Sequence, residues 1–214
     1  MTLLSVNSLT KLFGGLTALD RFDLQVAAGE IVGIIGPNGS GKTTFFNVLT
    51  GMYAANGGAI YLEGVKDNLL TRKTHEIIAC GISRTFQNQR PFNNLSVLEN
   101  VMVGGHCRTR AGIFSALLAL PAGRAEKRWI KDQALEVMGL FGDRLISMKE
   151  RPAWTLSYAN RRRLEIARAL VSRPRLLLLD EPTAGMNPAE SMQMVDKILE
   201  INRMGVTVLV IEHN

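Results

Sequence analysis

A glycine-rich loop is the first place in this chain where residue types and spacing could do chemistry. Residues 36–43 read GPNGSGKT and fit the phosphate-loop pattern G-x-x-x-x-G-K-[ST]. Glycines let backbone N–H groups turn around phosphate oxygens, and the start of a following helix adds partial positive charge. Lys42 would reach the β- and γ-phosphates, and the Thr43 hydroxyl would ligate Mg²⁺. The predicted nucleotide contacts are Gly36, Pro37, Asn38, Gly39, Ser40, Gly41, Lys42, Thr43 and Thr44.

Two adjacent carboxylates form the second candidate. Asp180 and Glu181 follow the four leucines 176–179. Alone they would be read as two solvated acids at the end of a strand. In an open α/β sheet, however, ligands bind at the carboxyl ends of the strands. We therefore expect Asp180 to hold Mg²⁺, through water, and Glu181 to polarise the water that attacks ATP.

The elements that must position these residues alternate between strand and helix. Short apolar, β-branched runs predict strands at 3–6, 22–26, 30–35, 59–63, 175–180 and 206–211. Helices are expected from 42 to about 49, from 159 to 172 and from 189 to 204. Near-continuous Leu, Ile and Val strands predict a mainly parallel sheet that is buried on both faces. Residues 91–157 are helical in character and read as an insertion.

Composition limits the remaining classes. Hydrophobic residues make up 46% of the 214 and charged residues 21%, an ordinary globular balance. The longest apolar stretches, 113–120 and 206–211, are far shorter than the roughly 20 residues of a membrane helix. We expect neither a transmembrane segment nor a signal peptide. The net charge of +6 fits a solvated basic surface, a nucleic-acid partner or an anionic lipid surface. Cys80 and Cys107 are expected to be reduced, buried thiols.

Three further features, in order along the chain, resemble the ABC ATPases. Gln87 stands in Arg84-Thr85-Phe86-Gln87-Asn88, as in the Q-loop of that family. Residues 156–160 read LSYAN just before the acidic strand, like the family signature, and a terminal strand leads to His213. The resemblance covers essentially the whole chain. It implies a P-loop NTPase of the ABC type, with a mainly parallel core, an antiparallel β portion and an inserted helical subdomain.

The resemblance also implies roles for residues outside the phosphate loop. Gln87 would sense Mg²⁺ and the γ-phosphate, and His213 would hydrogen-bond the γ-phosphate. Phe13 would stack on adenine. Ser157 and Ala159 would face the ATP of a second subunit, in a head-to-tail dimer that buries two nucleotides. The predicted catalytic residues are Glu181, His213, Gln87 and Lys42, and the predicted metal site is Thr43, Gln87 and Asp180.

The chain departs from the family pattern around its signature. The usual sequence is Leu-Ser-Gly-Gly-Gln, and Ala159 stands here in place of a glycine that approaches the γ-phosphate. We expect a competent but slower ATPase, because the added methyl group crowds a phosphate oxygen. Arg161, Arg162 and Arg163 follow at the start of a helix, where cations oppose the dipole. They are expected to be solvated, with at least one turned back toward a local carboxylate, or to add positive potential near the partner's phosphates.

Several short stretches resemble the branched-chain amino-acid uptake subfamily. They are Phe13–Leu16, His106–Gly112, Leu156–Tyr158, Arg162–Arg168 and Glu181–Pro188, with Asn187 where most ABC ATPases have aspartate. The resemblance implies a bacterial importer with two membrane-spanning permease subunits and a second ABC ATPase, identical or paralogous. A periplasmic substrate-binding protein would feed the permeases. The chain would lie on the cytoplasmic face of the inner membrane as a peripheral subunit.

Other functions fit the same scaffold. A lipopolysaccharide-export ATPase shares the basic signature helix but normally carries aspartate in place of Asn187. Urea or amide uptake is another transport alternative. The alternative of a soluble ABC ATPase that acts on nucleic acid or the ribosome is supported by the positive charge alone. The basic residues of the chain lack the interleaved aromatic residues expected of a face that binds single strands.

The predicted domains are residues 1–90, the first part of the ATP-binding core, 91–157, the helical subdomain, and 158–214, the second part of the core. We expect this core to be truncated after His213, since family members continue beyond it.

Overall fold

The computed structural model describes residues 1–85, 91–108 and 121–212. The chain divides into two compact units that are each assembled from separate segments of sequence. The first unit comprises Met1–Arg84, Arg175–Pro182 and Ile198–Asn214, and the second comprises Thr85–Pro174 and Thr183–Lys197. Across the part of the chain that is described, no helix combines the length and the apolar character needed to cross a bilayer.

A three-stranded antiparallel sheet forms one side of the first unit. Its central strand β1, Thr2–Phe13, pairs with β2, Leu16–Ala27, and with β4, Gly57–Leu62. Leu4, Val6 and Leu9 of β1 are buried. The register shifts between Val6 and Leu9, where Ser8 has φ 47°. This bulge breaks the alternation of buried and exposed residues, so the sequence pattern revealed only parts of these two long strands.

A four-stranded parallel sheet carries the carboxylates. Its strands lie in the order β3-β7-β6-β5, with the bounds Ile31–Ile35, Thr207–Glu212, Leu176–Asp180 and Ile82–Arg84. The four leucines 176–179 of β6 are fully buried, as expected for a strand covered on both faces. Ile35 is paired with Glu212, and Asp180 with Ile211, so the strands end along a common edge. Ligands of open α/β folds bind at this kind of edge.

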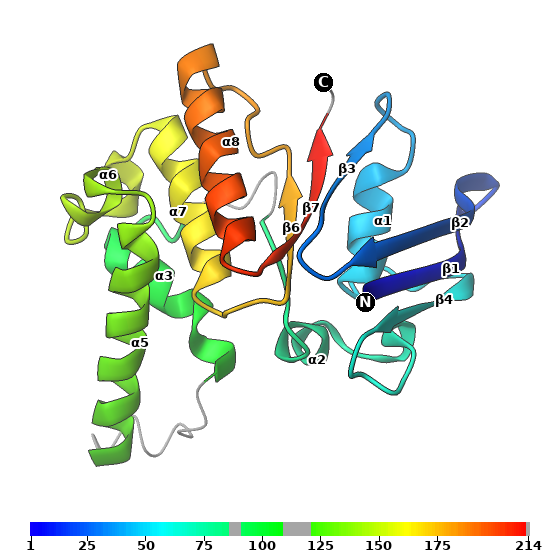
Figure 1. The fold of residues 1–214 in the computed structure, drawn as a ribbon, viewed down its shortest axis with the longest axis horizontal. Coiled ribbons are helices and arrows are strands. Elements are labelled where there is room, and N and C mark those ends of the chain that lie inside the picture. Colours follow the sequence, from blue (N-terminus) through cyan, green and yellow to red (C-terminus); the bar gives the residue numbers. More distant parts are fainter. Residues whose placement is uncertain (86–90, 109–120, 213–214) are drawn as a thin grey trace. The chain divides into compact units, whose positions relative to one another are not determined.

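Helix α1, Lys42–Leu49, joins the two sheets into one core (Figure 1). Its residues Phe45 and Phe46 are 2% and 0% exposed. They belong to one hydrophobic cluster with Leu4 and Leu62 of the antiparallel sheet and Leu178 of the parallel sheet. The start of α1, which follows the glycine-rich loop, is therefore fixed by packing on both sides of the helix.

One helix, the short turn before it and one strand of the first unit were not predicted from the sequence. Helix α2, Thr74–Ala79, follows a short 3₁₀ turn, η1, at Leu69–Thr71 and leads into strand β5. Strand β5 spans only three residues, and a run of that length gives no periodicity to detect. Its place beside β6 is nevertheless decisive for the site, because it brings Arg84 to Asp180.

The second unit is helical. It contains α3 (Val97–Gly104), η2 (His106–Arg108), α5 (Pro121–Gly139), α6 (Asp143–Ile146), η3 (Ala153–Thr155), α7 (Tyr158–Leu170) and the first part of α8 (Pro188–Arg203). Helices α3 and α7 approach closely, since a Cβ on Gly104 would overlap the carbonyl oxygen of Arg168. Ser96 and Glu99 cap α3 reciprocally, and Asn187 and Glu190 do the same for α8.

The observed architecture confirms the predicted fold class in its two sheets and its helical part. The predicted domain boundaries remain a prediction. The compact units follow a different division, with α7 in the helical unit. The two cysteines form no disulfide, as expected, but the expectation of burial is wrong, because Cys107 is exposed and Cys80 only half-buried.

Candidate functional site

The glycine-rich loop connects β3 to α1 and is open to solvent. Pro37 to Ser40 are exposed, and Gly39 and Gly41 have φ values of 82° and 91°. This left-handed backbone is readily available only to glycine. At Gly41 the space is also closed, because a Cβ there would collide with the carbonyl oxygen of Ala18. The loop's conformation therefore depends on Gly41, which the motif requires, and on Gly39, which stands at one of its variable positions.

Lys42 lies inside the loop. The residue is 8% exposed, and its Nζ donates to the carbonyl oxygens of Gly36 at 2.5 Å and Pro37 at 2.9 Å. A bound nucleotide would offer phosphate oxygens to the same ammonium group. Lys42 is thus already held against the loop where it is predicted to contact the phosphates.

The first turn of α1 favours an anion. Among the described residues, no side chain caps this turn and none of its own residues is acidic. The amide groups of a helix start carry partial positive charge and need an acceptor. Thr43, in this turn, is exposed, so its hydroxyl is accessible to a metal ion, and Thr44 is half-buried. The loop and helix start together fit the triphosphate of a nucleotide.

Asp180 and Glu181 differ sharply in environment. Asp180 ends β6 at 1% exposure and accepts a hydrogen bond from Arg84 at 2.8 Å through Oδ2. Glu181 is half-buried and has φ 49°, a region that non-glycine residues seldom occupy. Its amide donates to the carbonyl oxygen of Ile211 at 3.0 Å. Strained backbone of this kind is concentrated at functional sites, and here it redirects the chain directly after the buried aspartate.

Aromatic side chains lie near the end of β1. Phe13 is 42% exposed and meets Tyr53 edge-to-face, with ring centroids 5.4 Å apart. The Lys11 ammonium lies 4.8 Å from the Phe13 centroid. An exposed aromatic face suits a base-stacking role. Sequence analysis did not identify Tyr53 as a candidate site residue, because a single tyrosine shortly after Gly51 belongs to no recognisable motif.

The signature residues begin α7 in the second unit. Ser157 caps the helix, with its hydroxyl accepting from the Asn160 amide at 3.4 Å. Ala159 is helical and buried at 4% exposure, so the alanine is compatible with its backbone. The ring of Tyr158 packs against Gly185, where an added Cβ would lie 3.0 Å from Cε1. Position 185 favours glycine for two reasons: the close contact with Tyr158 and the positive φ of 72°.

The expectation of three solvated arginines is wrong. Arg162 and Arg163 are only 6% and 4% exposed. Arg162 donates to Glu165 at 2.9 Å and to the Tyr158 hydroxyl at 3.1 Å, which confirms that one arginine turns toward a local carboxylate. Arg163 donates to Asn160 at 2.8 Å and Gln193 at 3.3 Å. These arginines organise the second unit internally. Arg161 donates to the carbonyl oxygens of Leu156 and Trp154, each at 3.0 Å.

Two predicted site residues, Gln87 and His213, lie outside the described residues. Of the others, the structure brings the phosphate loop, Asp180, Glu181 and Phe13 into the first unit, and Ser157 and Ala159 into the second. Within the described ranges, no group of three or more His, Cys, Asp or Glu side chains could hold a metal ion alone. A metal at Asp180 would therefore need further oxygen donors, such as a hydroxyl and phosphates, which is the usual way Mg²⁺ is held in nucleotide sites.

The glycines of the loop offer a matched test. Gly41→Ala and Gly39→Ala both force alanine into left-handed backbone, but only the first has a clash, since nothing lies within 4 Å of a Cβ on Gly39. We expect Gly41→Ala to lower the free energy of unfolding by about 1–3 kcal/mol more than Gly39→Ala. It should also weaken ATP binding more strongly. Urea unfolding and nucleotide titration measure both quantities, and equal losses in the two variants would contradict the clash.

Known proteins share this arrangement. The sequence pattern of the ABC transporter family matches residues 19–184. The chain is 42% identical to the high-affinity branched-chain amino acid transport ATP-binding protein LivG of Escherichia coli K12, over 99% of this chain and 82% of LivG. BraF of Pseudomonas aeruginosa, named for the same transport, is 41% identical over the same shares.

Solved structures agree with the sequence comparison. The ATP-binding cassette MJ1267, in its ADP conformation, superposes with a TM-score of 0.83 and 32% identity. The alignment covers 100% of this chain and 82% of that one. These likenesses confirm the predicted P-loop, ABC-type fold and the predicted kinship with branched-chain amino-acid transport subunits. The chain therefore belongs to the ABC transporter family, as one of its ATP-binding and ATP-hydrolysing subunits.

Proposed function

We propose that this chain binds MgATP and powers an importer of branched-chain amino acids. The observation that carries the proposal is the 42% identity to LivG along almost the whole chain, in a protein whose phosphate loop and strand-end carboxylates have the geometry described above. Bound Mg²⁺ would neutralise charge on the phosphates. It would be held by the Thr43 hydroxyl and, through water, by Asp180, with Gln87 as a further contact.

The hydrolytic roles that we propose follow the motifs that the chain shares with ABC ATPases. Lys42 would exchange its contacts with loop carbonyl oxygens for the β- and γ-phosphates. Glu181 would accept a proton from the attacking water, and His213 would hydrogen-bond the γ-phosphate. Phe13, which is 42% exposed, would stack on adenine. The exposed Ser157 and the start of α7, which contains the buried Ala159, would approach the ATP of a second subunit in a head-to-tail dimer.

The partners proposed are two permease subunits and a second ATPase, identical or paralogous, with a periplasmic binding protein acting on the permeases. The chain would work at the cytoplasmic face of the inner membrane. A permease helix would dock near Pro91–Val101, shortly after Gln87 in the chain. Phe92 in this segment is 52% exposed and would be accessible to such a helix.

Gln87→Ala tests the coupling. We expect the variant to bind nucleotide with near-normal affinity but to lose transport driven by ATP, because Gln87 would connect the γ-phosphate to the helical unit. Nucleotide titration and substrate uptake in proteoliposomes measure the two effects separately. Normal uptake by Gln87→Ala would exclude this role.

Co-purification distinguishes the transport alternatives. Tagged protein, extracted gently from native membranes, should recover two multi-span permeases and a related ATPase. Uptake of leucine, isoleucine and valine by the recovered complex should then depend on ATP. Recovery of lipopolysaccharide-export components, uptake of urea or amides, or recovery of ribosomes or nucleic acid without permeases would overturn the proposal.

A further inference from the structure

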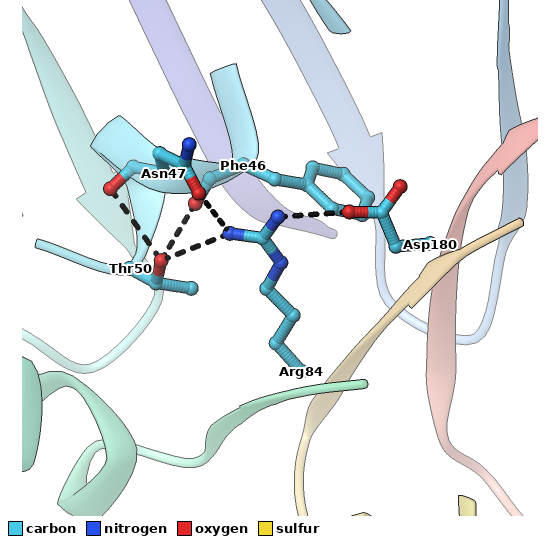
Figure 2. A network of polar contacts seen from close by, with 5 residues as sticks. All are labelled: Phe46, Asn47, Thr50, Arg84 and Asp180. Atoms are coloured by element: carbon cyan, nitrogen blue, oxygen red, sulfur yellow. Dashed lines mark hydrogen bonds and ion pairs between the residues drawn. The ribbon is translucent and has the colours of Figure 1, made fainter. Parts of the chain in front are cut away.

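A buried arginine holds the carboxylate that is proposed to serve the metal. Arg84 ends β5, and its side chain is 4% exposed, while that of Asp180 is 1% exposed. The guanidinium Nη2 lies 2.8 Å from Asp180 Oδ2 (Figure 2). A charge-assisted hydrogen bond in such a dry site is short and strongly directional. Asp180 is therefore held by a fixed partner as well as by its strand.

The same guanidinium contacts the end of α1. Nη1 of Arg84 donates to Asn47 Oδ1 at 2.7 Å and reaches Thr50 Oγ1 at 3.5 Å. The Thr50 hydroxyl in turn donates to the Phe46 carbonyl oxygen at 2.7 Å. The Arg84 guanidinium carbon also lies 5.2 Å from the Phe46 ring centroid. Figure 2 shows Arg84 between this helix and Asp180.

This network connects the two parts of the proposed magnesium site. Helix α1 begins at Lys42 and carries Thr43, and it ends one residue before Thr50, so both ends of one rigid helix are involved. Strand β6 ends at Asp180. Burial lowers the pKa of the Arg84 guanidinium, whereas the hydrogen bond and charge of Asp180 act in the opposite direction. Arginine remains protonated in proteins, so the cation persists.

We propose that Arg84 is a positioning residue for Mg²⁺. It orients the Asp180 carboxylate and ties it to α1, so that Asp180 and the Thr43 hydroxyl are aligned before the metal and ATP arrive. The inference rests on the metal role of Asp180 in the proposed function. A buried ion pair can also be purely structural, since similar pairs elsewhere are replaceable by apolar residues without loss of fold. Metal affinity separates these two roles.

Arg84→Lys is the most informative variant. It keeps the positive charge but loses the planar guanidinium group, which contacts β6 and α1 at the same time. Electron paramagnetic resonance of Mn²⁺, titrated with a non-hydrolysable ATP analogue, reports metal binding without turnover. The signal from Mn²⁺ and analogue without protein is subtracted. We expect the Mn²⁺ dissociation constant to rise by about 10-fold or more, as is usual when a partner of a metal ligand is changed. Binding of the analogue in EDTA should be unchanged.

Two controls make the result decisive. Arg175→Lys alters an arginine–carboxylate pair of the same unit, with Glu63 at 2.9 Å, but on the surface, and it should leave Mn²⁺ binding unchanged. Asp180→Asn should weaken Mn²⁺ binding strongly. If it does not, the proposed metal role of Asp180 fails, and not the role of Arg84 alone.

The remaining outcomes are also informative. With Asp180→Asn behaving as expected, unchanged Mn²⁺ affinity in folded Arg84→Lys would make Arg84 a structural residue and overturn the inference. Tighter Mn²⁺ binding would overturn it as well, because Arg84 would then compete with the metal. Should Arg84→Lys fail to fold, Asn47→Ala removes the anchor on α1 and leaves the ion pair. It is expected to weaken Mn²⁺ binding, and unchanged affinity would contradict the proposal.

Discussion

Glu181→Gln is expected to bind MgATP normally and to hydrolyse it about 10²–10⁴ times more slowly, which is the usual contribution of a general base. The amide is nearly isosteric with the carboxylate but cannot accept a proton from water. The half-buried side chain follows the fully buried end of β6, so the substitution leaves the core untouched. Single-turnover hydrolysis and nucleotide titration measure the two effects.

A carboxylate in the same unit serves as the control. Glu63→Gln neutralises a partly exposed acid that pairs with Arg175, and it should leave hydrolysis unchanged. Hydrolysis by Glu181→Gln at a rate close to that of the wild type would remove Glu181 from its proposed role. Loss of MgATP binding in the variant would show instead that Glu181 acts on the bound ground state.

Arg162→Met is expected to destabilise the second unit by about 3–5 kcal/mol, because it removes the cation that is hydrogen-bonded to the buried carboxylate of Glu165. The pair is 2.9 Å apart, and the two side chains are 8% and 9% exposed. Burial acts to lower the pKa of Arg162, but the charges and hydrogen bonds of Glu165 and Tyr158 together outweigh it and raise that pKa. Urea unfolding followed by circular dichroism measures the loss of stability.

The double variant Arg162→Met/Glu165→Leu is the matched comparison. Removing both charges together should restore most of the stability, because replacing a whole buried pair by apolar side chains is often neutral or stabilising by about 1–4 kcal/mol. A double variant as unstable as Arg162→Met alone would show that the packing of Arg162, and not charge balance, is what the unit needs.

The loss of stability caused by Arg162→Met should also depend on pH. Burial raises the pKa of Glu165, and Arg162 opposes this rise. Without Arg162, the pKa of Glu165 in the folded protein should lie further above its unfolded value. An acid whose pKa is higher in the folded than in the unfolded protein stabilises the fold at pH values below its unfolded-state pKa. This stabilisation is lost as the pH rises through its folded-state pKa. Arg162→Met should therefore be more destabilised, relative to the wild type, at alkaline than at acidic pH.

The phosphate loop, the acidic strand and the parallel sheet could be predicted because each depends on contiguous residues. The backbone conformation of the loop is determined largely by its own eight residues. The leucines 176–179 identify a strand that is buried on both faces. Arg84 stood within the stretch that resembles the Q-loop, yet its contact with Asp180 depends on the pairing of β5 with β6. Such a contact between residues 96 positions apart leaves no local signal.

The arginine run shows a different limit. Three consecutive cations at a helix start suggested solvation, since helix dipoles disfavour them. Burial of Arg162 and Arg163 depends on partners from one turn of the same helix and, for Gln193, from the distant helix α8. Likewise, the positive φ of Glu181 follows from the junction after β6 and could not be inferred from the residue type.

The division into two units has a consequence for recombination between relatives. The chain passes from one unit to the other four times, after residues 84, 174, 182 and 197. Neither unit is therefore a continuous stretch that could be cloned or inherited alone. To graft the helical unit of one transporter onto another, residues 85–174 and 183–197 would have to be exchanged together. The eight residues between them, with both candidate carboxylates, would stay with the recipient.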